Sequence, residues 1–180
     1  EIVTVIVTGT RRSGRTVADS PVPIDVIVAD NLARSGFTET NRLLNEQLPS
    51  FNFPQPSITD GTDVVRPATL RGLGPDQTLV LINGKRRHTA SLLNINGSVG
   101  RGTSAVDINL IPSIALSRVE VLRDGAAAQY GSDAIAGVIN FQLRDKPEGG
   151  RITVNYGQFE TSLRGVPQFT GLALGPTGQP

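Results

Sequence analysis

Hydrophobic and charged residues alternate along residues 118–121, which read Arg-Val-Glu-Val. This period of two predicts a strand with one buried face and one polar face. Three alanines at 126–128 then favour a short helical turn, and the apolar run at 138–141 predicts a second strand. Glycines at the joints, Gly125 and Gly131 among them, let the chain fold back tightly.

The pattern predicts further elements upstream. Residues 22–28 are interrupted by a proline and predict a strand at a sheet edge. Asp30 is expected to cap a short helical turn, and Thr38 to cap a helix that Pro49 ends. The spacing of that helix directs three leucines toward the core: Leu43, Leu44 and Leu48.

A tight hairpin is predicted where the apolar run 79–82 meets Asn83-Gly84, because this dipeptide favours a primed turn. A basic cluster follows at residues 85–88. Residues 50–63 and 89–106 are polar, rich in turn-forming residues and without clear periodicity, which predicts loops. Loops of this length in small domains often carry function.

Composition narrows the classes of function. Only 38% of the residues are hydrophobic and 4% aromatic, so the core is expected to be thin and aliphatic. A net charge of +1 gives no argument for nucleic-acid binding. The absence of cysteine excludes disulfides and thiolate metal sites, and the single histidine, His88, lacks neighbours for a metal or a catalytic site. We therefore expect no enzyme activity and no cofactor.

Three segments in one order strongly resemble the plug domain of TonB-dependent outer-membrane receptors. They are Leu-Arg-Gly-Leu-Gly at 70–74, Asp-Ile-Asn-Leu-Ile-Pro at 107–112, and the stretch 118–140, which contains Arg-Val-Glu-Val-Leu-Arg, Tyr-Gly and Gly-Val-Ile-Asn. One departure is Asp124-Gly125, where many members carry Gly-Pro. The resemblance implies an α+β plug with a small mixed β-sheet and short helices.

The resemblance also implies a domain organisation. Residues 1–15 would be an N-terminal segment with a TonB box, 16–146 the plug, and 147–180 a linker with the first strand or strands of a transmembrane β-barrel. Alternating apolar residues at 152–156 fit such a strand. The protein would lie in the outer membrane of a Gram-negative bacterium, with the plug inside the barrel and the N-terminus in the periplasm.

The implied function is gated, energised uptake of a scarce nutrient such as a ferric siderophore. The implied partners are the periplasmic domain of TonB, the chain's own C-terminal β-barrel and the nutrient. One alternative is a soluble periplasmic interaction module with plug-like architecture. A nucleotide-binding enzyme rests only on the glycines at 72–74 and 97–102, which match no phosphate-binding motif.

Three groups of site residues follow from the resemblance, each with a simpler alternative. The TonB box, otherwise an ordinary edge strand, comprises Ile2, Val3, Thr4, Val5, Ile6 and Val7. The resemblance implies that two arginines pair with barrel glutamates as a latch: Arg71 and Arg123. The simpler alternative is that both are ordinary surface charges. The resemblance also implies loop residues that face the ligand, whereas the simpler alternative is that these loops are solvated connectors. The ligand-facing candidates are Phe53, Gln55, Asp60, Arg87, His88, Asn94 and Asn96.

Overall fold

A computed structural model describes most of the chain up to residue 145. The described residues are 8–10, 14–20, 22–59, 61–95, 97, 99–124, 126–145 and, further on, 152, 154, 156–158 and 160. Residues 1–150 and 151–180 form two units, which we describe separately.

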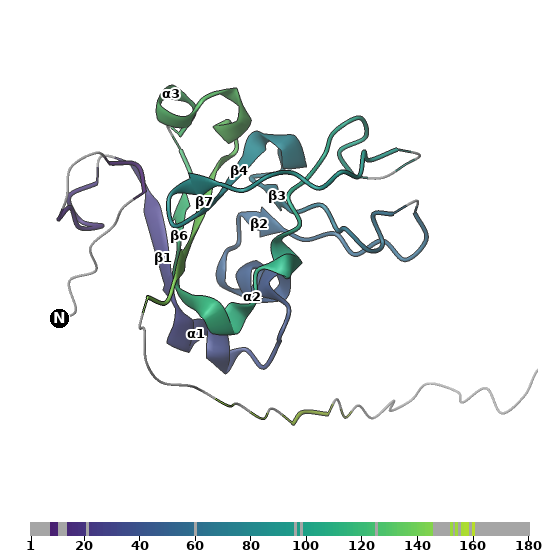
Figure 1. Ribbon diagram of the computed structural model, residues 1–180, viewed down its shortest axis with the longest axis horizontal. Coiled ribbons are helices and arrows are strands. Elements are labelled where there is room, and N and C mark those ends of the chain that lie inside the picture. Colours follow the sequence, from purple (N-terminus) through teal and green to yellow (C-terminus); the bar gives the residue numbers. More distant parts are fainter. Residues whose placement is uncertain are drawn as a thin grey trace, which may run out of the picture. The chain divides into compact units, whose positions relative to one another are not determined.

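The first unit is built on a mixed five-stranded sheet with the order β1-β6-β7-β4-β5 (Figure 1). The β4–β7 pair is parallel and the other pairs are antiparallel. Its strands are β1 (Ile24–Val28), β4 (Thr78–Ile82), β5 (Lys85–Arg86), β6 (Leu116–Leu122) and β7 (Gly137–Leu143). The predicted α+β class with a mixed sheet is confirmed, and β1 lies at an edge as its proline suggested.

Short elements surround this sheet. The two strands β2 (Phe51–Asn52) and β3 (Thr69–Leu70) pair separately. The helices are α1 (Ala29–Arg34), α2 (Thr40–Gln47) and α3 (Ala126–Tyr130), with 3₁₀ turns η1 (Pro75–Gln77), η2 (Ile108–Leu110), η3 (Ser113–Ala115) and η4 (Ser132–Ala134). In Figure 1, α1 and α2 lie near one end of the central strands and α3 near the other.

The sheet buries both faces. The larger core joins Val119, Val121 and Phe141 to α1 and α2, including the three leucines predicted to be buried. The smaller core, on the other face, contains Leu122 and Val138 with residues of α3 and η4. The alternation along β6 therefore separates two buried faces rather than a buried face and a wet one.

That arrangement corrects the prediction of a polar face on β6. Glu120 is 0% exposed, because chain from elsewhere covers it. The glycine that begins β7 is required at this crossing: Gly137 has φ +144°, and a Cβ there would lie 2.4 Å from the Leu122 carbonyl oxygen. The Gly-Val-Ile-Asn strand can approach β6 only with glycine in that place.

Two predicted helix caps are wrong and one predicted turn is correct. The residue that caps α1 is Val28 and the residue that caps α2 is Glu39, so Asp30 lies in the first turn of α1 and Thr38 precedes the α2 cap. Helix α1 begins directly after β1, which leaves no loop for a polar cap. The Asn83-Gly84 turn has φ values of 48° and 77°, as a primed hairpin turn requires.

In the second unit, the described residues do not form the predicted strand. Ile152, Val154 and Tyr156 are between 88% and 96% exposed and belong to no strand. A barrel strand obtains its backbone hydrogen bonds from neighbouring strands, so the alternating pattern alone does not create one. Within the described part of the chain, no helix has the length and apolar character needed to span a membrane.

Candidate functional site

The structure brings Arg71 and Arg123 together, although they are 52 residues apart in the sequence. Arg71 follows β3 with φ 57°, a left-handed conformation that is rare for a residue with a side chain. Its backbone N–H donates to the Ser50 carbonyl at 2.7 Å, and its Nη1 donates to the Arg123 carbonyl, also at 2.7 Å. These contacts hold the arginine in a conformation that its side chain disfavours.

Each arginine also has a carboxylate nearby in this chain. Arg123 Nη2 donates to Asp25 Oδ1 at 3.1 Å, and its Nε lies 2.8 Å from Asp25 Oδ2. Arg71 Nη1 lies 3.8 Å from Asp124 Oδ1. The two arginine side chains are 41% and 42% exposed. A guanidinium carries more N–H donors than these contacts use, so both remain able to bind further acceptors.

A cavity of about 610 Å³ opens beside Arg123. It lies between strand β1, helix α1 and the chain that follows α2, and its polar lining includes Asp25, Asn31, Gln47 and Ser50. Arg123 is therefore accessible from the side of the edge strand.

The two predicted loops pack against each other. A Cβ at Gly61 would lie 2.7 Å from Leu92, and the two loops project to the same side of the domain in Figure 1. Main-chain hydrogen bonds from Ala90 to Ala105 and from Asn94 to Thr103 fold the second loop back on itself. Exposed aliphatic side chains that the sequence pattern did not indicate lie on these loops or directly after the first of them: Ile58, Val64, Leu93 and Ile95.

Two of the ligand-facing candidates are buried, which corrects their expected orientation. Phe53 is 6% exposed in the larger core, with the Arg66 guanidinium 5.9 Å from its ring centre. Asn94 is 2% exposed. Both residues hold the loops in place.

The other ligand-facing candidates differ in accessibility. Gln55 and His88 are exposed and Arg87 is half-buried. Asp60 and Asn96 lie outside the described residues, as does the predicted TonB box at 2–7.

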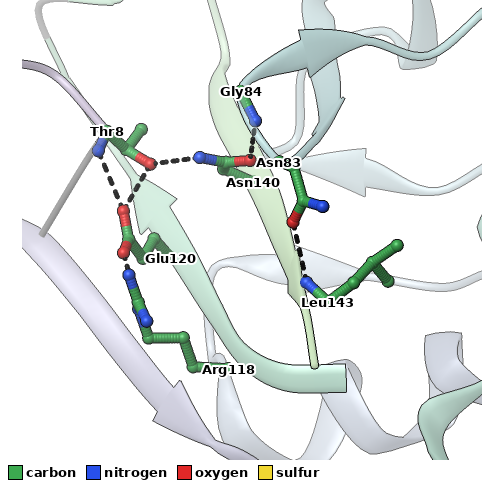
Figure 2. Close-up of polar contacts among 7 residues, drawn as sticks. All are labelled: Thr8, Asn83, Gly84, Arg118, Glu120, Asn140 and Leu143. Carbon is green, nitrogen blue, oxygen red and sulfur yellow. Dashed lines mark hydrogen bonds and ion pairs between the residues drawn. The ribbon is translucent and has the colours of Figure 1, made fainter. Parts of the chain in front are cut away.

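A buried polar cluster surrounds Glu120 (Figure 2). Thr8 donates to Glu120 Oε2 through its backbone N–H at 2.9 Å and its hydroxyl at 2.6 Å. Arg118 Nε donates to Glu120 Oε1 at 2.8 Å. Asn140 Nδ2 donates to the Thr8 hydroxyl at 2.9 Å, and Asn140 Oδ1 accepts from the Gly84 N–H at 3.0 Å.

None of the predicted site residues belongs to this cluster. Its signal lies in the strand register, because Glu120 pairs directly with Asn140 across β6 and β7. Two polar residues at the centres of strands that face each other indicate a polar site inside the sheet. The contribution of Thr8, 112 residues away from Glu120, could not be read from either strand.

The domain thus has a mixed sheet and two loops that pack against each other. Arg71 and Arg123 lie together at its surface, and Thr8 is hydrogen-bonded to the interior of the sheet. The family model for the TonB-dependent receptor plug domain matches residues 16–138, more than half of the chain. The chain belongs to this family, as the sequence resemblance predicted. It is a family of outer-membrane receptors of Gram-negative bacteria, in which the plug is a transporter component and not an enzyme.

The curated relatives that match are longer than this chain. It is 30% identical over 117 residues to the ferric enterobactin receptor of Pseudomonas aeruginosa, covering 65% of this chain and 16% of that protein. It is 28% identical over 179 residues to the vitamin B12 transporter BtuB of Vibrio cholerae, covering 98% of this chain and 26% of that protein. The chain thus spans about a quarter or less of these relatives.

Solved structures agree with the assignment. The ferric enterobactin receptor PfeA is similar with a TM-score of 0.53 and 28% identity, over 69% of this chain and 18% of that one. The unliganded ferric citrate transporter FecA is similar with a TM-score of 0.57 and 25% identity, over 73% of this chain and 19% of that one.

Proposed function

We propose that this chain is the plug of a receptor that imports a ferric siderophore across the outer membrane. The match to the plug family over residues 16–138 is the observation that carries the proposal. Relatives named for ferric enterobactin support an iron-chelate cargo, whereas the BtuB relatives are named for vitamin B12. The plug would block the barrel formed by the chain that follows and present its two loops to the ligand.

An uptake experiment tests this cargo. Cells that carry the intact protein as their only receptor of this kind should accumulate iron-55 from a ferric siderophore, and a strain lacking TonB should not. Accumulation of labelled vitamin B12 without iron would show that the cargo is vitamin B12, and the proposal of a transporter would stand. Equal uptake with and without TonB would contradict energised transport.

The same proposal places the protein in the membrane. A barrel that begins within residues 147–180 predicts that the intact protein sediments with outer membranes and resists extraction by carbonate. Release into the periplasmic fraction would instead favour the alternative of a soluble interaction module with plug-like architecture.

Residues 2–7 are the proposed handle for TonB. A β-branched segment can add as a strand to the edge of a partner's sheet, with affinity drawn mainly from backbone hydrogen bonds. In a peptide of residues 1–10, Val5→Ala should bind the periplasmic domain of TonB nearly as well as the parent, and Val5→Pro should not, because proline removes a donor. Equal binding of the two variants in a titration would exclude strand addition.

Arg71 and Arg123 are the proposed latch to the barrel wall. Their proximity and partial exposure support this role, since both guanidinium groups can reach acceptors outside the plug. Barrel carboxylates would add to the contacts with Asp124 and Asp25, and removal of either arginine should then increase amide exchange throughout the plug.

A further inference from the structure

Thr8 and Gly9 close one face of the central sheet over a buried carboxylate. Glu120 is 0% exposed and Thr8 is 1% exposed, and two of the hydrogen bonds to Glu120 come from Thr8. A buried carboxylate is tolerated only where hydrogen-bond donors replace water. The segment that carries the proposed TonB box therefore ends in a residue on which the interior of the sheet depends.

Gly9 holds the same segment in place in two ways: it hydrogen-bonds to helix α3 and it packs closely against Leu122. Its N–H donates to the Tyr130 hydroxyl at 3.0 Å, which ties it to helix α3. With φ +72°, a Cβ at this position would lie 3.3 Å from Leu122 Cδ2. The N-terminal segment is thus held by side chains of β6, β7 and α3, in a place where only a small residue fits closely.

Asn140 connects this anchor to the β4–β5 hairpin. Its amide nitrogen donates to Thr8, and its amide oxygen accepts from the Gly84 N–H, so both ends of the side chain are engaged. The neighbouring Asn83 accepts from the Leu143 N–H at 2.8 Å (Figure 2). Strand β5, which follows this turn, leads directly to Arg87 and His88, two of the residues predicted to face the ligand.

We propose that Thr8, Glu120 and Asn140 form a release clasp that fastens the N-terminal segment and couples it to the Asn83-Gly84 turn. Opening the clasp withdraws two donors from a carboxylate inside the sheet, so the segment detaches in one step rather than gradually. It also removes the acceptor that orients the Asn140 amide, which loosens the hold on Gly84. The inference deepens the proposed function, because it says how traction on residues 2–7 would enter the plug.

Coupling of this kind is reciprocal: what loosens the turn must also loosen the N-terminal segment, by the same factor. A buried carboxylate with a purely structural role would stabilise the whole sheet. It would not link the exchange of Thr8 to that of Gly84 while the rest of the sheet stays protected.

The experiment is amide hydrogen exchange on the intact protein in detergent, without TonB and without ligand. Thr8→Val keeps the shape of the side chain and removes its hydroxyl. The matched control is Thr16→Val, because Thr16 also donates its hydroxyl to a carboxylate, Asp19, at 2.6 Å, but in solvent. Thr8→Ser keeps the hydroxyl and serves as the conservative variant that should retain the clasp.

Thr8→Val should raise exchange about tenfold at residues 8–10, as expected for loss of a hydrogen bond to a charged group. Exchange at Gly84 should rise as well, while the amides at the centre of β4 remain protected. Asn140→Ala should raise exchange at both places, whereas Thr16→Val and Thr8→Ser should raise it at neither.

Three results would overturn the clasp. They are unchanged exchange at residues 8–10 in Thr8→Val, a rise there without a rise at Gly84, and an equal rise across the whole sheet. None of these depends on cargo or on TonB binding, so failure of the clasp and failure of the transport proposal are distinguishable.

Discussion

Two arginine–carboxylate pairs of this domain have the same separation and very different surroundings. Arg118 Nε lies 2.8 Å from Glu120 and Arg123 Nε lies 2.8 Å from Asp25. The first pair has side-chain exposures of 25% and 0%, the second of 42% and 34%. In the first pair, Nε donates the hydrogen bond; in the second, Nη2 donates to Asp25 and Nε has no hydrogen-bond partner among the described residues.

The comparison shows that distance alone does not assign a role to an ion pair. In solvent, the attraction is screened and the arginine can exchange partners. Inside the sheet, the carboxylate depends on each donor, because water cannot replace a lost one. Arg118–Glu120 therefore acts as a fixed internal element, whereas Arg123 can transfer from Asp25 to a carboxylate on a barrel.

The largest difference is expected from removal of each arginine. Arg118→Ala leaves Glu120 buried with fewer donors and should cost about 3 kcal/mol in the opening free energy of β6. Arg123→Ala should cost less than about 1 kcal/mol if Asp25 is its only partner. Amide exchange of β6 in the intact protein measures both.

The same pair of variants tests the latch. If barrel carboxylates bury Arg123 in the intact receptor, Arg123→Ala should cost as much as Arg118→Ala. Equal costs would support the latch and remove the contrast between the two arginines; a small cost for Arg123 would leave it as a surface charge.

Replacing each carboxylate by the amide of the same shape should give a smaller difference in stability between the two pairs. Glu120→Gln replaces an acceptor oxygen by an NH₂ group beside donors, which should lower stability by about 2 kcal/mol. Asp25→Asn should change it by less than about 0.5 kcal/mol, because the half-exposed site remains in contact with water. Thermal unfolding of the plug provides the measurement, and similar shifts for both would show that burial does not govern these pairs.

Two substitutions of Arg71 measure the cost of its left-handed backbone conformation, because both remove the proposed latch side chain. Arg71→Gly should relieve about 1 kcal/mol of left-handed backbone strain, while Arg71→Ala retains the strain, and both lose the contact with the Arg123 carbonyl. The plug should therefore open less easily in the glycine variant than in the alanine variant, as exchange near β3 would report. Equal exchange would mean that the φ of 57° costs nothing.

The smallest effect is expected from salt. Raising the ionic strength to about 1 M shortens the screening length to about 3 Å, which should remove most of the contribution of Arg123–Asp25, a few tenths of a kcal/mol. The buried pair should be unaffected. A double-mutant cycle for each pair at low and high salt checks this, and salt sensitivity of Arg118–Glu120 would indicate that water reaches it.

Local patterns predicted the elements that depend on neighbours in the sequence. Asn83-Gly84 specifies its turn through two left-handed residues, and the leucines of α2 point inward because they share one helix face. The family resemblance extended this to the plug fold, and it chose Arg71 and Arg123, which the structure brings together. The predicted cap of α1 is wrong because that helix follows β1 without a loop, and the α2 helix begins after Glu39 rather than Thr38.

Which surfaces are covered depends on contacts between segments that lie far apart in the sequence. Alternation along β6 correctly assigns Glu120 to the face opposite Val119, but a period of two carries no information about whether that face meets water. Thr8, which is 112 residues away in the sequence, covers Glu120 and excludes water from it. Residues of the larger core bury Phe53 in the same way. Arg118 on the same strand supplies one hydrogen-bond donor to Glu120, but the two donors from Thr8 come from a distant part of the chain and replace solvent, so a long-range contact turns a polar strand position into a buried carboxylate.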